Sequence, residues 1–148
     1  MKLIFLHGLG QDAHSWKGVQ DALSPLQSES FAIFSHPSES YQEAKERLTE
    51  YLQQESEPFI LVGLSLGGVL ALELSSQDLP QLKGLVLSGT QYKLSTNLLY
   101  RLQILLFRMI PKRVFEKQGA NKQHMLQIFT ELKCLKNKNK NKSKNKQK

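Results

Sequence analysis

The feature that most limits the fold of this chain is an apolar segment that runs directly into a glycine-rich turn. Residues 59–62 read Phe-Ile-Leu-Val, and residues 63–68 read Gly-Leu-Ser-Leu-Gly-Gly. Nearly continuous apolar character is typical of a parallel strand that is covered on both faces. Small apolar residues follow from Val69 to Ser75 and predict a helix. The segment therefore predicts a buried strand, a sharp turn and a helix close to the sheet.

The same alternation of short apolar runs and amphipathic stripes extends over the first 90 residues. The predicted strands are residues 2–6, 31–34, 59–62 and 85–87. The predicted helices lie near residues 16–23, 38–52 and 69–75. Strands that alternate with helices at this spacing form a parallel sheet with helices on both faces. We expect an α/β fold with about four strands, in which the strand at residues 85–87 is an apolar edge prone to aggregation.

The alternation stops after Gly89. Residues 98–109 are a strongly apolar helical stretch that ends before Pro111, and Met125 to Leu132 carry a second helical stripe. From Lys136 to Lys148 the chain alternates mainly Lys and Asn, and such a segment cannot bury apolar surface. We expect a core over residues 1–92, a helical segment over 93–135 and a disordered tail over 136–148.

The net charge of +7 comes from this tail, which holds seven lysines and no acids. The other 13 lysines and arginines balance 13 aspartates and glutamates. A specific nucleic-acid surface on the folded part is therefore not expected. The tail alone could bind RNA or an acidic membrane with salt-sensitive affinity that is blind to sequence. Removing residues 136–148 would test that alternative.

One cysteine, Cys134, excludes an intramolecular disulfide and fits a reducing compartment. Leu3 to Leu6 is too short for the core of a signal peptide, and no apolar stretch is long enough to span a bilayer. We therefore expect a soluble, cytoplasmic protein. No metal-ligand cluster or cofactor motif is evident, and the sequence indicates no oligomeric state.

Ser65 is the candidate catalytic residue. A serine on a sharp strand-to-helix turn is held in a strained backbone conformation, with its hydroxyl at the helix N-terminus. Gly63 and Gly67 are expected because a Cβ at either place would collide with the neighbouring strand or helix. Gly68 is expected to let the helix begin close to the sheet. The strand, turn and helix together predict a nucleophile elbow.

A second motif, His7-Gly8-Leu9-Gly10, directly follows the first predicted strand. Acyl transfer needs two N–H donors aimed at the developing oxyanion, one after the nucleophile and one from a loop after an earlier strand. Leu66 and Leu9 are the candidates, and Gly8 and Gly10 would free the backbone to direct the Leu9 N–H inward.

These motifs and the strand that ends at Ser88-Gly89 resemble the α/β-hydrolase superfamily, specifically small bacterial esterase-like members with a helical cap. The resemblance covers residues 2 to about 132. It implies that Ser65 is the nucleophile, that the substrate is a small acyl compound such as an ester, and that residues 93–135 form the cap. Hydrolysis of esters, thioesters or amides, acyl transfer and peroxidase chemistry all stay open. The substrate pocket would then draw on apolar cap residues, namely Leu98, Leu102, Leu105 and Met109, although burial in a core explains them equally well.

The catalytic acid and histidine of that superfamily follow the cap, where this chain becomes Lys and Asn repeats. After Ser65 the only aspartate is Asp78 and the only histidine is His124. The acid and the base are thus both unassigned: His124 is the one histidine that could serve as base, and the alternative is that it is an ordinary polar residue of the cap. His7, by contrast, is expected to bind backbone groups, and His14 and His36 precede the serine. We hypothesise a truncated hydrolase, with the tail encoded by A-rich codons read out of frame. Without a base to activate Ser65, such a chain should be close to inert.

Two other interpretations stay open. Residues 8–13, Gly-Leu-Gly-Gln-Asp-Ala, also fit the dinucleotide-binding fingerprint, but the expected acid after the second strand is missing from Phe34-Ser35-His36-Pro37. Alternatively, the chain keeps the hydrolase fold and pocket as a non-catalytic remnant or binding module.

Overall fold

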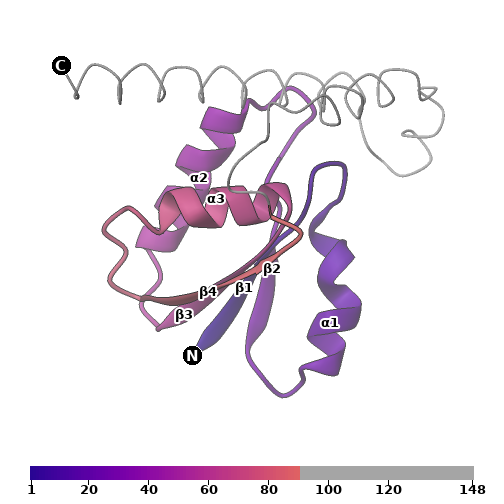
Figure 1. Cartoon of the computed structure of the whole chain (residues 1–148), viewed down its shortest axis with the longest axis vertical. Helices are drawn as coiled ribbons and strands as arrows, with labels where there is room; N and C mark the ends of the chain where they lie inside the picture. Colours follow the sequence, from indigo (N-terminus) through magenta and orange to yellow (C-terminus); the bar gives the residue numbers. More distant parts are fainter. Residues whose placement is uncertain (91–148) are drawn as a thin grey trace.

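The computed structural model describes residues 1–90, which form a four-stranded parallel sheet with helices on both faces (Figure 1). The strands are β1 (Lys2–Leu6), β2 (Ser28–Phe31), β3 (Phe59–Leu64) and β4 (Leu82–Ser88). The helices are η1 (Ala13–Trp16), α1 (Lys17–Ala22), α2 (Tyr41–Gln53) and α3 (Leu66–Leu74). The spatial order of the strands is β2-β1-β3-β4. The predicted α/β fold with a parallel sheet is confirmed, whereas the expected cap and tail lie outside the described residues.

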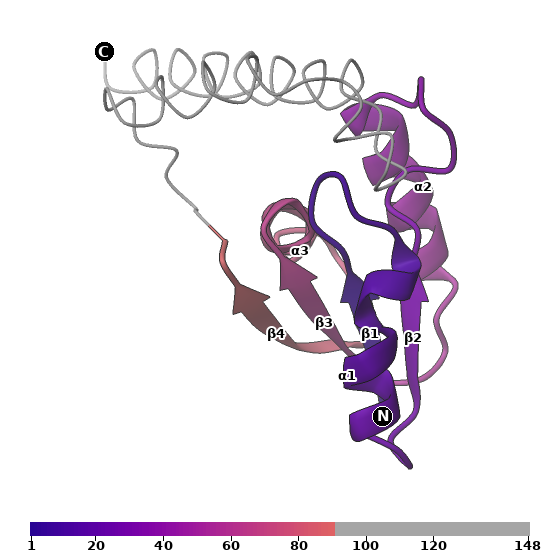
Figure 2. The same cartoon turned by 90° about the vertical axis from the view of Figure 1, so that its right-hand side faces the viewer.

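The sheet separates two unequal layers (Figure 2). On one face, α2 and α3 pack against alternate residues of β1 and β3 and enclose the main core. Its fully buried members include Ile4, Leu6, Tyr41, Leu48, Leu61 and Leu70. On the other face, the short α1 has no buried residue, and Trp16 before it covers Phe5 with ring centroids 4.8 Å apart. The core that positions the strand ends therefore lies on the α2 and α3 side.

β2 corrects the prediction of a strand at residues 31–34. The strand is Ser28–Phe31, and it pairs with β1 from Leu3↔Ser28 to Leu6↔Phe31. Its polar residues are tolerated because β2 is an outer strand of the described sheet and is only half-buried. Ile33, which follows the strand, nevertheless fills the core. The apolar pattern mispredicted the strand, because the Ile33 side chain can be buried although its backbone lies outside the strand.

The other elements differ from the prediction mainly at their ends. The second helix begins at Tyr41 because Ser40 caps it, accepting a hydrogen bond from the Glu43 N–H while the Glu43 carboxylate accepts one from the Ser40 N–H. The third helix begins at Leu66, three residues before the predicted start, and β3 and β4 are longer than predicted.

None of the described helices is long and apolar enough to cross a membrane.

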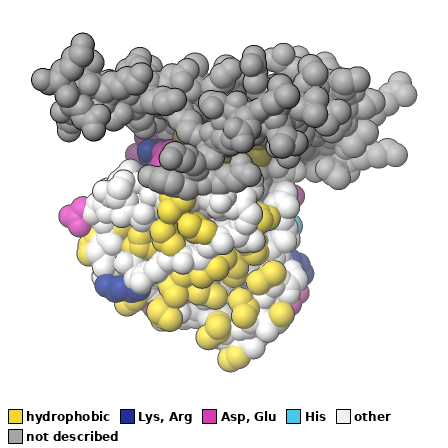
Figure 3. All heavy atoms as spheres, in the orientation of Figure 1, with side chains coloured by type: hydrophobic (Ala, Val, Ile, Leu, Met, Phe, Trp, Pro, Cys, Tyr) yellow, Lys and Arg dark blue, Asp and Glu magenta, His cyan; other side chains and the backbone are white. Residues whose placement is uncertain are grey.

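β4 is the outer strand opposite β2, as predicted for the strand at residues 85–87. Within the described sheet it pairs with β3 alone. Two of its apolar side chains face solvent, since Val86 is 51% and Leu87 40% exposed. Apolar side chains are prominent on the face of the described part that Figure 3 shows. An apolar outer strand of this kind is a hazard for edge-to-edge association.

Candidate active site

Ser65 lies at the junction of β3 and α3, between the last residue of the strand and the first of the helix. Its backbone has φ 52° and ψ −108°, and it is the one non-glycine residue with positive φ among residues 1–90. Two hydrogen bonds hold it there: its N–H donates to the Ser88 carbonyl at 2.9 Å, and its carbonyl accepts from the Val69 N–H at 3.1 Å. The residue is exposed. This is the backbone geometry of a nucleophile elbow.

Close contacts leave no room for a Cβ at the glycines around Ser65: Gly63 and Gly67 lie against backbone, and Gly68 lies against a side chain. A Cβ on Gly63 would lie 2.5 Å from the Cα of Gly68, and one on Gly67 would lie 2.3 Å from the carbonyl oxygen of Leu6. A Cβ on Gly68 would meet the Thr90 hydroxyl at 1.8 Å. The collisions predicted for Gly63 and Gly67 are therefore present, and Gly68 allows the start of α3 to approach the segment after β4.

The loop after β1 is a tight turn over residues 8–11. The Gln11 N–H donates to the Gly8 carbonyl at 3.2 Å, and the Gln11 side-chain oxygen accepts from the Gly8 N–H at 2.9 Å. Gly10, at the third position, has φ 79°, which a type II turn requires and which favours glycine. Glycine at position 8 has a different reason, since a Cβ there would lie 2.9 Å from the Gln11 side-chain oxygen.

This loop and the elbow lie side by side at the carboxyl ends of the central strands. β1 pairs with β3 through Leu6↔Gly63, and the Cβ contacts described above place Gly67 against the end of β1. After β1 the chain moves to β2 on one side, and it then crosses to β3 on the other (Figure 2). Ligands of open α/β sheets bind at such a switch point, outside the carboxyl ends of the strands. Within residues 1–90, nothing accepts a hydrogen bond from the N–H of Leu9 or Leu66.

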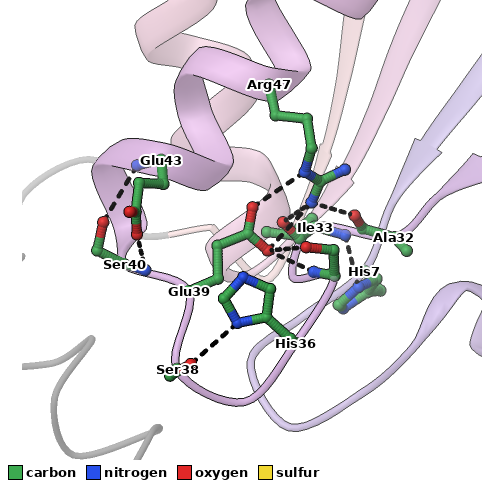
Figure 4. A network of polar contacts seen from close by, with 10 residues as sticks. His7, Ala32, Ile33, His36, Ser38, Glu39, Ser40, Glu43 and Arg47 are labelled. Carbon is green, nitrogen blue, oxygen red and sulfur yellow. Dashed lines mark hydrogen bonds and ion pairs between the residues drawn. The ribbon is translucent and has the colours of Figure 1, made fainter.

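The histidines within residues 1–90 interact with residues other than Ser65. His7 is 2% exposed; its Nδ1 donates to the Gly8 carbonyl at 2.9 Å and its Nε2 accepts from the Ile33 N–H at 3.0 Å. Burial lowers the pKa of His7, although the Gly8 carbonyl and Asp12 act in the opposite direction. His36 is exposed and pairs with Ser38 (Figure 4). The expected structural role of His7 thus agrees with its contacts.

His14 and Asp78 are also placed away from the serine. His14 is exposed in η1, where its N–H donates to the capping Asp12 side chain. Asp78 lies between the end of α3 and the start of β4. It is therefore near the amino ends of the strands, whereas Ser65 is at their carboxyl ends. His124 lies outside the described residues. The described part therefore brings together the elbow and the loop after β1, without a base or an acid.

An ion pair beside the segment that follows β2 was not found from the sequence. Glu39 is 3% exposed, and Arg47 of α2 donates to it from Nε at 2.9 Å (Figure 4). Burial alone would raise the pKa of Glu39, but hydrogen bonds from Arg47 and from the backbone and hydroxyl of Ser35 lower it below its usual value. Glu39 precedes the helix and Arg47 lies in its second turn, so no helical spacing indicated the pair.

Comparison with known proteins gives the family. The model of the alpha/beta hydrolase family matches residues 3–127, most of the chain. The chain belongs to this family. Comparison with curated proteins finds no match. Among solved structures, MenH from S. aureus aligns with a TM-score of 0.61 at 19% identity, over 78% of this chain and 50% of its own.

Two further solved structures share the hydrolase fold. A hydrolase from Pseudomonas aeruginosa aligns with a TM-score of 0.63 at 17% identity, over 86% of this chain and 62% of its own. An extracellular α/β-hydrolase from a Paenibacillus species aligns with a TM-score of 0.57 at 17% identity, over 86% of this chain and 65% of its own. This chain thus spans between half and two thirds of the length of these three proteins.

The site geometry of this member of the alpha/beta hydrolase family does not favour dinucleotide binding. Ala13, the third small residue of that fingerprint, begins the short 3₁₀ helix η1. The first buried carboxylate after β2 is Glu39, which is held by Arg47. Within residues 1–90, no group of three or more His, Cys, Asp or Glu side chains could hold a metal ion.

Proposed function

We propose that this chain is a serine hydrolase that acts on a small ester or a related acyl substrate, with Ser65 as the nucleophile. One observation carries the proposal: Ser65 is exposed and adopts φ 52° between a buried strand and a helix. A non-glycine residue in that region is strained by about 1–3 kcal/mol, and such strain concentrates at active sites. An idle serine would gain nothing from this conformation.

In the proposed reaction, the Ser65 hydroxyl oxygen bonds to the acyl carbon while a base accepts its proton. The N–H groups of Leu66 and Leu9 donate to the oxyanion of the tetrahedral intermediate. When this intermediate collapses, the bond to the alcohol breaks, the alcohol takes up the proton, and the acyl group stays on Ser65. Water then releases the acid by the same two steps. Both N–H groups lack an acceptor within residues 1–90, as donors kept for a substrate would.

The proposed base is His124, by elimination among the four histidines of the chain. His7 uses both ring nitrogens, and His14 and His36 are exposed beside other partners. The base decides whether the chain turns over, because loss of the histidine costs subtilisin roughly a millionfold in turnover. An oxyanion hole and substrate binding alone retain only about 10³–10⁴ over water.

A fluorophosphonate probe tests this function, because it phosphonylates a serine only when a base activates the hydroxyl. We expect labelling of the wild type that is absent in Ser65→Ala and strongly reduced in His124→Ala. His14→Ala is the matched control, since it removes an exposed histidine and should label as the wild type does. Absence of labelling in a folded wild type would overturn the proposal and favour a non-catalytic binding module.

The proposal extends to the substrate pocket and to the cellular compartment. The cap over residues 93–135, with Leu98, Leu102, Leu105 and Met109, is proposed to supply the apolar substrate pocket. A reducing, cytoplasmic setting is proposed on the single cysteine, Cys134. Acyl-chain preference in Leu102→Ala and Leu105→Ala, measured with esters of increasing length, tests the pocket.

A further inference from the structure

We propose that Arg47, held by Glu39, is a positioning residue for the oxyanion loop, and that it acts through a chain of hydrogen bonds that ends at the Leu9 N–H. The inference rests on the proposed function, in which that N–H donates to the oxyanion. The chain passes through the peptide between Ala32 and Ile33, the ring of His7 and the peptide between Gly8 and Leu9. None of the side chains that form this series of hydrogen bonds contacts the substrate.

The first link joins Arg47 to the backbone after β2. Its Nη2 donates to the Ala32 carbonyl at 2.9 Å and to the Ile33 carbonyl at 2.7 Å (Figure 4). The Ala32 carbonyl and the Ile33 N–H belong to one planar trans peptide, so they point in opposite directions. Holding the carbonyl from the side of α2 therefore directs the Ile33 N–H away from α2, toward His7.

The second link is the His7 ring, whose tautomer is fixed by its two partners. The Ile33 N–H can only donate, so the Nε2 that receives it at 3.0 Å carries no proton. The Gly8 carbonyl can only accept, so the Nδ1 that lies 2.9 Å away carries the proton. The ring thus accepts on the side of Ile33 and donates on the side of Gly8.

The third link is the peptide that carries the proposed oxyanion donor. The Gly8 carbonyl and the Leu9 N–H again form one trans peptide. The Gly8 carbonyl accepts from His7 and also from the Gln11 N–H at 3.2 Å. Two donors that fix this carbonyl also fix the opposite direction, in which the Leu9 N–H points.

Every hydrogen bond in this chain donates in the same direction, from the guanidinium toward the oxyanion. Hydrogen bonds arranged head to tail polarise one another, by about 10–30% per bond. A cation at the start of the chain strengthens each later donor, including the Leu9 N–H. Glu39 keeps Arg47 in place through Nε at 2.9 Å and Nη2 at 3.3 Å. The arrangement both orients and polarises one half of the proposed oxyanion hole.

The charged groups around His7 are compatible with a neutral ring. Burial lowers its pKa, while Asp12 on the loop side raises it. Glu39 and Arg47, on the side of β2 and α2, form an ion pair. Their opposite charges largely cancel in their effect on the His7 ring. A neutral His7 keeps Nε2 free to accept from Ile33, so the chain of bonds remains continuous at neutral pH.

The test compares the rate constant for fluorophosphonate labelling of the full-length chain in three variants. In Arg47→Met we expect it to fall about tenfold, less than the 10²–10³ that loss of a whole oxyanion donor costs. Because Arg47→Met leaves a buried carboxylate, the double variant E39Q/R47M removes the pair without that charge, and it should show the same loss. Lys45→Met is the matched control: Lys45 also lies in α2, and its pair with Glu73 (2.7 Å) is outside the chain of bonds. It should change the rate less than about twofold.

A second readout separates this inference from the proposed function. In NMR spectra, the His7 ring should be the neutral Nδ1–H tautomer, and Arg47→Met should move the Leu9 amide proton upfield while leaving that of Leu66 in place. If the wild type is not labelled, the proposed function fails and the amide shift alone decides the inference. An unmoved Leu9 amide overturns the inference whatever the rate does, and so does an unchanged rate in a wild type that is labelled.

Discussion

The two segments that meet at the candidate site are held by different means. The elbow around Ser65 is fixed by its own backbone. A Cβ on Gly63 or Gly67 would lie only 2.3–2.5 Å from neighbouring backbone atoms, and the Ser65 peptide groups bond to the end of β4 and to the first turn of α3. The loop after β1 is fixed by side chains that come from elsewhere, namely His7, Gln11 and, through Ile33, Arg47. One segment depends on the absence of side chains and the other on their presence.

This difference indicates how each segment should fail. Steric constraint gives the elbow one conformation, so substitution there should unfold the chain or leave the geometry intact. A loop held by hydrogen bonds can lose one partner and shift slightly, so its failures should be graded.

Gly67→Ala should cause the largest loss of stability. Its Cβ would lie 2.3 Å from the Leu6 carbonyl oxygen and 2.8 Å from that of His7, and neither backbone group can move cheaply. We expect the free energy of unfolding, measured in urea, to fall by about 3 kcal/mol or more. Gly18→Ala is the control, because nothing lies within 4 Å of its Cβ and it is also in a helix. That change should stabilise by about 0.5–1 kcal/mol; equal effects in both variants would contradict steric control of the elbow.

Arg47→Met should cost less, about 2 kcal/mol in the free energy of unfolding. Breaking a fully buried ion pair costs about 3–5 kcal/mol, but the Arg47 side chain is 35% exposed. The double variant E39Q/R47M should regain more than half of the loss, because no unpaired charge stays buried. If the double variant is less stable than Arg47→Met, the cost does not arise from Glu39.

Ser65→Gly should increase stability by about 1 kcal/mol, because glycine adopts φ 52° without strain. The same change removes the proposed nucleophile, so stability and labelling should move in opposite directions. Ser75→Gly serves as the control: Ser75 caps the other end of α3 with an ordinary φ of −64°, and it should lose about 0.5–1 kcal/mol. A destabilised Ser65→Gly would mean that the serine is not strained.

Acidification should weaken the loop through His7. The pKa of His7 is lowered from 6.5 in the folded state, mainly by burial, so the unfolded chain binds more protons below that pH. The stability from His7 is thus complete above about pH 6.5 and declines as the pH falls toward the folded pKa. Glu39, whose pKa is lowered from 4.5, adds a separate loss only below about pH 4.5. Urea titrations from pH 7.5 to 5 should show the decline in the wild type and not in His7→Asn; a flat wild-type profile would contradict it.

Much of the fold was predictable because its signals are local. Two local patterns each combine a buried strand with a turn that needs small residues. One is the apolar run at residues 59–62 with the glycines at 63, 67 and 68, and the other is the motif at residues 7–10. The strand Ser28–Phe31 was not predictable, because its polar residues are accommodated by an outer position that is a property of the whole sheet. Its apolar neighbour Ile33 misled the prediction by contributing to the core from outside the strand.

The candidate site was predictable to the same extent and no further. Ser65 and its glycines follow from a contiguous motif, whereas the pairs Glu39–Arg47 and His7–Ile33 join residues 8 and 26 positions apart and depend on tertiary structure. The proposed base, His124, is not among residues 1–90, and the sequence assigns no catalytic acid.

The position of the covalent adduct shows whether Ser65 is an activated nucleophile. The full-length chain is treated with a fluorophosphonate, digested, and analysed by tandem mass spectrometry. We expect one adduct per chain, on Ser65, which disappears when the chain is first unfolded in urea. An adduct on another residue, or none on a chain shown to be folded, would mean that Ser65 is not an activated nucleophile.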